Sequence, residues 1–274
     1  MFAVPAPSAP VPRRVLGLLG VLAAVLAGAF VVAPGVVAGG EFGSQSDLSA
    51  ALRAAFTGYW DAGGRDLSPD LERVVDYWFR YHVAKGAFAA MLLIVLLALG
   101  RLVWTAYLRA DGTGRRGVLA TTGLSLGMFA AFALVAVMAN VQGAAAPFAS
   151  LLPMLPDGGH DPRLAGTLDQ VRSQLAGAPD GRTPPLDAMV GDFARYHLVM
   201  AVIAAVVAVV LLAVGVVLGR AFARSAGRRG RGVLGASGGL SVLAALALVV
   251  VAVANTGNAA DPAPGLLAFF QGGW

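Results

Sequence analysis

The sequence predicts an all-α membrane protein: a polytopic bundle of five transmembrane helices in which a two-helix unit is duplicated. The first observation is composition. The 274 residues are 58% hydrophobic and 13% charged, and the mean hydropathy is +0.75, whereas soluble domains carry about 25% charged residues. The second observation is a repeat, because the Arg-Tyr-His sequence at 80–82 recurs at 195–197, each time before a long apolar run.

Five apolar runs are long enough to cross a membrane. Each has roughly 20 residues, which as a helix spans a hydrocarbon core of about 30 Å. The runs are continuously apolar and lack the alternation of a barrel strand, so helices are the spanning form that fits them. They cover residues 15–37, 83–100, 117–139, 198–219 and 232–254.

The repeat continues without a gap at the same shift of 115 residues. The Arg-Gly-Val-Leu sequence at 116–119 recurs at 231–234, and Asn140 recurs as Asn255. Each copy contains two spans, so both copies cross the membrane in the same direction. This predicts a parallel repeat about an axis along the membrane normal.

These boundaries divide the chain into five parts. We expect a cytoplasmic tail (1–14), a first helix with its outer loop (15–67), repeat one (68–156), a second outer loop (157–182), and repeat two with an outer C-terminal tail (183–274).

Each outer loop is expected to contain a short extracytoplasmic helix. In the first loop, Ser46 or Asp47 is placed to cap a helix over residues 48–59, because short polar side chains are favoured at that position. In the second loop, Pro162 begins a helix to residue 176, since proline is well tolerated in a first helical turn.

The distribution of charge predicts the orientation. The N-terminal tail and the two short loops at 101–116 and 220–231 hold more than half of the basic residues but only one acid, Asp111. Because basic short loops stay in the cytoplasm, we expect the N-terminus inside and the C-terminus outside. Cleavage near residues 36–38, as of a signal peptide, is left open as an alternative.

A polar cluster is predicted where the repeated spans meet the outer surface. His82 and His197 begin two spans, and Asn140 and Asn255 end two others. A parallel repeat would bring these four side chains to one depth near the axis. The candidate ligand or partner site comprises Arg80, Tyr81, His82, Lys85, Asn140, Arg195, Tyr196, His197, Met200 and Asn255.

The cluster has two interpretations. In the first it is structural, with tyrosine and arginine anchored among lipid headgroups and asparagine capping helix ends. In the second, the imidazoles of His82 and His197 bind a haem, a metal ion or a quinone. Lys85 in one copy corresponds to Met200 in the other, and Met200 shares a helix face with His197 that would suit copper.

Missing motifs restrict the function. The chain contains no cysteine, which excludes disulfides, thiol nucleophiles and cysteine-ligated metals. It contains no P-loop, which would indicate nucleotide binding. It also contains no H-E-x-x-H motif, which would indicate a zinc protease. The spans contain no acidic residue, which disfavours a transporter with a proton relay or cation site.

Two resemblances concern the family. Basic residues are almost all arginine, with Lys85 as the single lysine, and the chain is rich in alanine, glycine and valine. In this composition it resembles uncharacterised multi-pass membrane proteins of high-GC Gram-positive bacteria. Residues 139–141 (Ala-Asn-Val) and 193–197 (Phe-Ala-Arg-Tyr-His) are similar to stretches of the anthrone-oxygenase-like family of four-helix membrane proteins. The first resemblance implies no function, and the second implies an oxygenase.

We therefore expect a non-enzymatic integral protein of the bacterial cytoplasmic membrane. It would act as an interaction or lipid-contacting scaffold, with no cofactor and no nucleic acid. Its partners would be the lipid bilayer and other membrane proteins or further copies of itself. The alternative is a haem-, metal- or quinone-binding oxidoreductase that uses His82 and His197, and a lesser alternative is a transporter.

Overall fold

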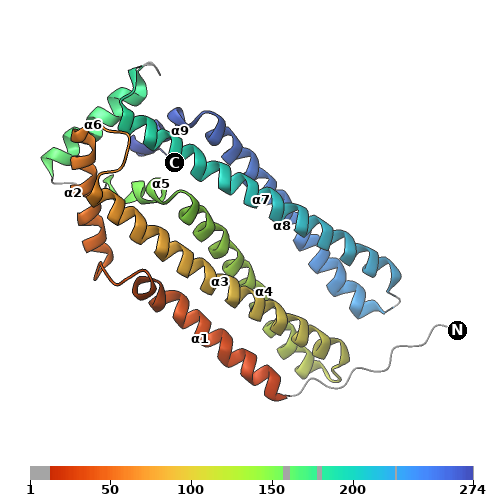
Figure 1. Ribbon diagram of the computed structural model, residues 1–274. Helices are drawn as coiled ribbons and strands as arrows, with labels where there is room; N and C mark the ends of the chain where they lie inside the picture. The colour runs from red at the N-terminus through yellow and green to blue at the C-terminus, as the bar shows by residue number, and fades with distance from the viewer. Residues whose placement is uncertain (1–12, 157–160, 178–180, 226, 274) are drawn as a thin grey trace. The chain divides into compact units, whose positions relative to one another are not determined.

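The computed structural model describes residues 13–156, 161–177, 181–225 and 227–273 (Figure 1). Throughout these ranges the regular structure is helical and no strand occurs, which confirms the predicted fold class. Residues 1–12 of the predicted cytoplasmic tail lie outside the described residues. Arg13 and Arg14 already belong to the first helix.

Five of the described helices are long and apolar enough to cross a membrane. Their outward faces carry exposed leucine, valine and phenylalanine side chains, as contact with lipid requires, because lipid offers no polar partners. The chain is therefore a multi-pass membrane protein. The five helices are α1 (Arg13–Val37), α3 (Pro69–Arg109), α4 (Thr113–Ala145), α7 (Pro184–Arg224) and α8 (Arg228–Ala260).

The boundaries of the long helices follow the shift of 115 residues found in the sequence. Helices α3 and α7 have 41 residues each, and α4 and α8 have 33 each. Both α3 and α7 begin at a proline, which suits a first turn because its missing N–H would have no helical partner there. Gly112, between α3 and α4, has φ +85°, a conformation that favours glycine.

Shorter helices lie between and after the long ones. Helix α2 begins at Gln45, before both residues that were expected to cap it, so that expectation was wrong. Ser44 is the N-cap, and its Oγ accepts a hydrogen bond from the N–H of Asp47 at 3.1 Å. Asp47 instead lies in the first turn, where a negative charge suits the helix dipole. The helix predicted from Pro162 is confirmed. The shorter elements are α2 (Gln45–Ala62), α5 (Pro147–Leu151), η1 (Leu152–Met154), α6 (Pro162–Ala176) and α9 (Pro262–Phe270).

The described part of the chain divides into two compact units, of which the first comprises residues 13–32 and 87–137. Within it, Leu26 of α1 packs against Val95 and Leu99 of α3. On the next face of α3, Leu96 packs against Ala130 and Ala133 of α4. Small side chains at such contacts allow close helix packing in a membrane.

The second unit comprises residues 33–86 and 138–274, and its main core lies in what we call the cap. The cap consists of α2, α5, η1, α6 and α9 with the first turns of α3 and α7. Its core is aromatic and aliphatic: the Phe148 ring lies edge-on to Tyr59, with centroids 6.1 Å apart, and Leu155 and Leu266 are fully buried. A single core thus joins segments that are far apart in the sequence.

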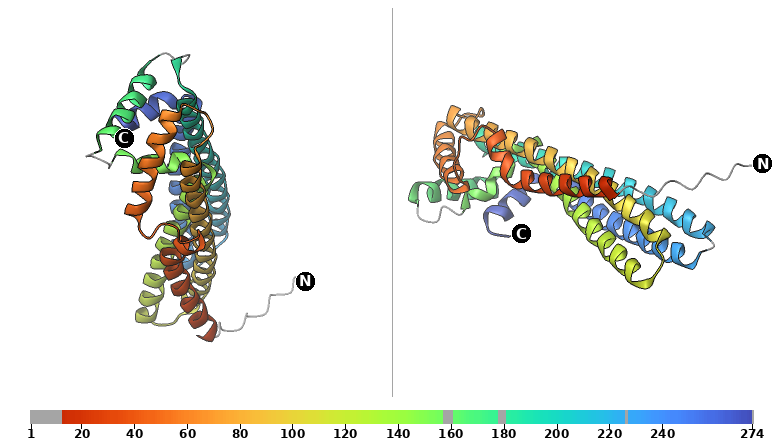
Figure 2. Two further views of the ribbon diagram at one scale, coloured as in Figure 1. Left: turned by 60° about the vertical axis from the view of Figure 1, so that its left-hand side comes forward. Right: turned by 90° about the horizontal axis from the view of Figure 1, so that it is seen from below.

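In the same unit, α7 packs along α8 (Figure 2). The two backbones approach closely at Gly215, where a Cβ would lie 2.9 Å from Val242 and 3.5 Å from the carbonyl oxygen of Gly238. Glycine at this crossing is therefore required by packing, as is common between membrane helices.

Candidate functional site

The first repeated pair joins His82 on α3 to Asn140 on α4. The distance from His82 Nδ1 to Asn140 Oδ1 is 2.9 Å. An amide oxygen only accepts, so Nδ1 carries the proton and donates. Asn140 was expected to end its span, but α4 continues to Ala145. Asparagine is tolerated inside this helix because the imidazole bonds its side chain, which then does not compete for backbone groups.

The second pair joins His197 on α7 to Asn255 on α8 at 2.8 Å. Asn255 Nδ2 also donates to the carbonyl oxygen of Val251 at 2.8 Å. This second bond fixes the orientation of the amide, so Oδ1 faces the imidazole and Nδ1 of His197 is the donor. In the neutral ring, Nε2 then carries a lone pair that can accept a hydrogen bond.

The structure therefore pairs the four residues within their own repeats. Each histidine bonds to the asparagine 58 residues further along. A separate bond connects the two repeats, since Gln142 Nε2 donates to the carbonyl oxygen of Tyr196 at 3.1 Å. Gln142 is buried, and sequence reasoning did not single it out, because its counterpart at the shift of 115 residues is Gly257.

Aromatic rings and Gly143 enclose the histidine of repeat one. The ring centroid of Trp78 lies 4.7 Å from that of His82 and 5.0 Å from that of Tyr81. The imidazole lies over the backbone of Gly143, where a Cβ would be 2.6 Å from Nε2. Nε2 of His82 is buried and, among the described groups, has no hydrogen-bond partner.

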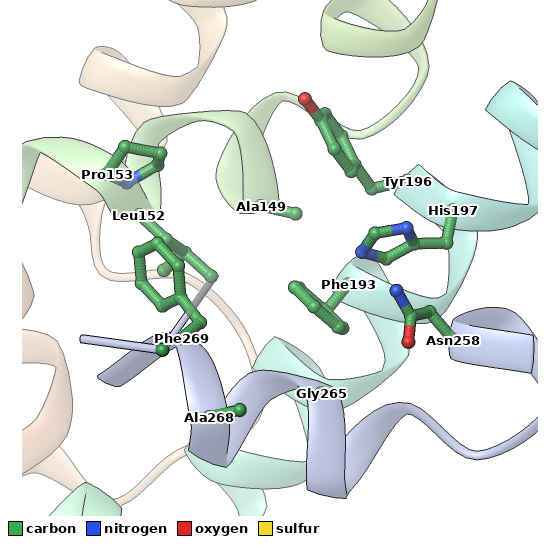
Figure 3. A pocket seen from close by; sticks show the side chains of 11 residues that line it. Ala149, Leu152, Pro153, Phe193, Tyr196, His197, Asn258, Gly265, Ala268 and Phe269 are labelled. Carbon is green, nitrogen blue, oxygen red and sulfur yellow. The ribbon is translucent and has the colours of Figure 1, made fainter. Parts of the chain in front are cut away.

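The histidine of repeat two lines a pocket instead. The pocket has a volume of about 320 Å³. The imidazole of His197 projects into it from α7, and the Phe193 ring lies 4.5 Å from the imidazole (Figure 3). The remaining walls come mainly from α5 and η1, from Asn258 on α8 and from α9. Of the ten predicted site residues, Tyr196 and His197 line this pocket.

The predicted charged residues contact other groups. Arg80 Nε donates to the carbonyl oxygen of Asp76 at 3.2 Å, and Arg195 Nη1 lies 3.8 Å from Asp192 Oδ1. Lys85 Nζ donates to the Tyr81 hydroxyl at 3.1 Å. Met200, the counterpart of Lys85 in repeat two, is half-buried. None of these four residues is among those lining the pocket beside His197.

Sequence reasoning missed two residues of α7 and α8. Asp192 Oδ2 accepts from the N–H of Ala149 at 2.8 Å and so attaches α5 to α7. Asn258 lines the pocket, and its signal was present in the sequence: it stands 115 residues after Gly143. Repeat one thus has glycine, and repeat two has asparagine, at this position beside the histidine.

The polar side chains that pair with the two histidines do so through hydrogen bonds. No group of three or more His, Asp or Glu side chains in the described part of the chain is placed to hold a metal ion. Comparisons with protein-family models, with curated proteins and with solved structures found no match.

Proposed function

We propose that this chain is a non-enzymatic membrane scaffold whose cap is the interacting part. Its five long helices would anchor it, and the cap would contact lipid headgroups and other membrane proteins or a second copy of the chain. A scaffold requires a rigid surface held at a fixed place relative to the membrane. The cap has one continuous core, and α7 runs without a break from this core into its apolar span, which supports this role.

The observation that carries the proposal is the use of the repeated polar residues. His82 bonds to Asn140 and His197 bonds to Asn255. Such bonds between membrane helices are typical of structural contacts, which contribute about 0.6 to 2 kcal/mol each. The residues that the repeat retains are thus accounted for by helix pairing, without a reaction.

We place the protein in a bacterial cytoplasmic membrane, with the N-terminus inside and the cap outside. The support is the distribution of charge. The connections between α3 and α4 and between α7 and α8 are short and flanked by arginine, which favours the cytoplasmic side. The cap carries acidic side chains, such as Asp61 and Asp169, besides basic ones.

A quinone-binding oxidoreductase is the second candidate, because an imidazole lines a largely apolar pocket. A haem or metal ion bound by both histidines would need both Nε2 atoms at one cavity. Nε2 of His82 is buried over Gly143, whereas His197 lines the pocket. The geometry therefore favours a role for His197 without His82 if the protein does bind a redox ligand.

Absorption spectra and metal analysis of the full-length protein in mild detergent test the scaffold proposal. The protein is measured oxidised and reduced, beside a His82→Ala/His197→Ala variant and a matched Asn140→Ala/Asn255→Ala variant. The control breaks the same two hydrogen bonds but keeps both imidazoles. We expect the same spectrum from all three proteins. A Soret band or stoichiometric copper that only the histidine variant loses would overturn the proposal.

A further inference from the structure

Three residues that line the pocket beside His197 differ from their counterparts in repeat one in ways that change the space around the histidine. Phe193 corresponds to Trp78, Asn258 to Gly143 and Gly265 to Ser150, each at the shift of 115 residues. All three residues of repeat two line the pocket. These differences, compared one at a time, explain why one copy has a pocket beside its histidine.

In repeat one, a tryptophan and a serine fill the space. The indole N–H of Trp78 donates to Ser150 Oγ at 2.8 Å, which fixes the ring beside His82. In repeat two, the smaller Phe193 replaces the indole. Gly265 leaves the serine position without a side chain, and a Cβ there would be 3.4 Å from Phe193. The two replacements remove side-chain volume on the same side of the histidine.

The third difference determines where the imidazole lies. The His82 ring occupies the space directly over Gly143, in which a Cβ would be only 2.6 Å away. Asn258 places a side chain at the corresponding position of repeat two, so the His197 ring cannot lie over the helix in the same way. It lies beside the pocket instead (Figure 3).

The lining defines the chemistry of an occupant. Leu152, Phe193 and Phe269 supply apolar walls, and the lining includes no Asp, Glu, Lys or Arg. A charged molecule would lose its hydration there without a compensating partner. The polar side chains among the lining residues belong to Tyr196, His197 and Asn258. In the neutral ring of His197, Nε2 is an acceptor because Nδ1–H is bonded to Asn255.

The volume limits the size of the occupant. About 320 Å³ falls within the range of small-molecule sites, about 300 to 1,000 Å³. A dry cavity of about 150 Å³ holds one benzene molecule. The pocket therefore has space for one ring and a short chain.

We propose that this pocket binds an uncharged, mainly apolar molecule that carries one hydroxyl group, which donates to His197 Nε2. The site lies beside the histidine of repeat two, with Ala149, Leu152 and Pro153 of repeat one completing its wall. Beside the histidine of repeat one, Trp78, Ser150 and the His82 ring itself fill the corresponding space. Binding needs no electron or group transfer, so the inference goes beyond the scaffold role and does not depend on it.

The test uses 4-propylphenol as the probe and its methyl ether, 4-propylanisole, as the matched molecule without a donor. Affinity for the full-length protein is measured by calorimetry at one fixed detergent concentration. We expect the phenol to bind roughly ten times more tightly than the ether, the factor that one hydrogen bond supplies. Equal affinities for phenol and ether, or no saturable binding of either, would overturn the proposal.

Two variants locate the binding. Phe193→Trp with Gly265→Ser introduces the residues that repeat one carries, and it should lower phenol affinity at least tenfold. Gly257→Ala is the control, because no atom lies within 4 Å of its Cβ position, and it should bind as the unchanged protein does. An unaltered affinity in the double variant would place binding elsewhere and overturn the proposal. If the double variant fails to fold, Phe193→Trp alone serves the same purpose.

A third variant tests the acceptor. His197→Phe keeps an apolar ring in the wall and removes Nε2, so the phenol should lose its advantage over the ether. Retention of a tenfold preference in this variant would exclude His197 Nε2 as the acceptor. None of these outcomes depends on whether the cap has a protein partner, so this inference and the scaffold proposal can fail separately.

Discussion

The imidazole of His82 lies directly over Gly143, so close that a Cβ on Gly143 would be 2.6 Å from both Cε1 and Nε2. The ring cannot easily move away, because Nδ1 is bonded to Asn140 and Trp78 packs against it edge-on. Glycine is thus required at position 143 by a neighbouring side chain, and not by its own backbone angles.

Gly143→Ala should therefore destabilise the protein. We expect a loss of about 1 to 3 kcal/mol, the usual cost of inserting an extra methyl group into a packed site. Gly257→Ala is the matched control in α8, where no atom lies within 4 Å of the Cβ position; it should stabilise by up to about 1 kcal/mol through helix propensity. Thermal unfolding in mild detergent measures both. Equal effects of the two substitutions would contradict the close contact at His82.

The two histidine–asparagine pairs should each show energetic coupling. A double-mutant cycle with His82→Ala and Asn140→Ala, and a second cycle with His197→Ala and Asn255→Ala, isolates each pair. We expect a coupling of about 0.5 to 1.5 kcal/mol in each cycle, as for hydrogen bonds between membrane helices. Coupling across repeats, for example between His82 and Asn255, should be close to zero, and a larger value there would contradict the pairing within repeats.

Tyr59 provides a pH-dependent test of the cap. Its side chain is fully buried, and its hydroxyl donates to the carbonyl oxygen of Arg65 at 3.1 Å. Burial raises the pKa of this tyrosine above its ordinary value of 10.0, because desolvation disfavours the phenolate. The folded state therefore holds its proton more tightly than the unfolded state, and the contribution to stability is fully present below pH 10.0 and is lost as the pH rises through the folded-state pKa.

Tyr59→Phe removes both the hydrogen bond and this titration. At pH 8 the variant should be less stable by about 1 kcal/mol, the typical value of one hydrogen bond. The difference in unfolding free energy between the two proteins should shrink as the pH rises above about 10. Denaturation of both proteins at a series of pH values measures it. A difference that stays constant to pH 12 would show that Tyr59 does not titrate with unfolding.

The sequence predicted the long helices well for a simple physical reason. A run of apolar residues that crosses lipid must satisfy its own backbone groups, and a helix does so locally. The repeat also singled out His82, His197, Asn140 and Asn255, which do bond in pairs. The sequence did not predict which histidine bonds to which asparagine. A repeat shows which positions of the two copies correspond, but it does not show which side chains are in contact.

The difference between the two copies was visible in the sequence, but its consequence was not. Gly143 and Asn258 occupy corresponding positions, yet only the coordinates show that the His82 ring fills the space over Gly143. The pocket beside His197 also depends on α9, which follows the last long helix and turns back on α7. Such a contact depends on tertiary packing, which a periodic pattern of apolar residues in the sequence does not predict.

The orientation in the membrane can be tested directly because the chain contains no cysteine. Single substitutions Ser46→Cys in the first turn of α2 and Thr113→Cys at the start of α4 introduce one thiol each, at exposed positions. If the cap lies outside the cell, a membrane-impermeant maleimide should label Cys-substituted position 46 in intact cells. Position 113 should react only after the membrane is permeabilised, because short arginine-flanked connections stay in the cytoplasm. Labelling of position 113 in intact cells, with position 46 protected, would reverse the proposed orientation and place the pocket beside His197 toward the cytoplasm.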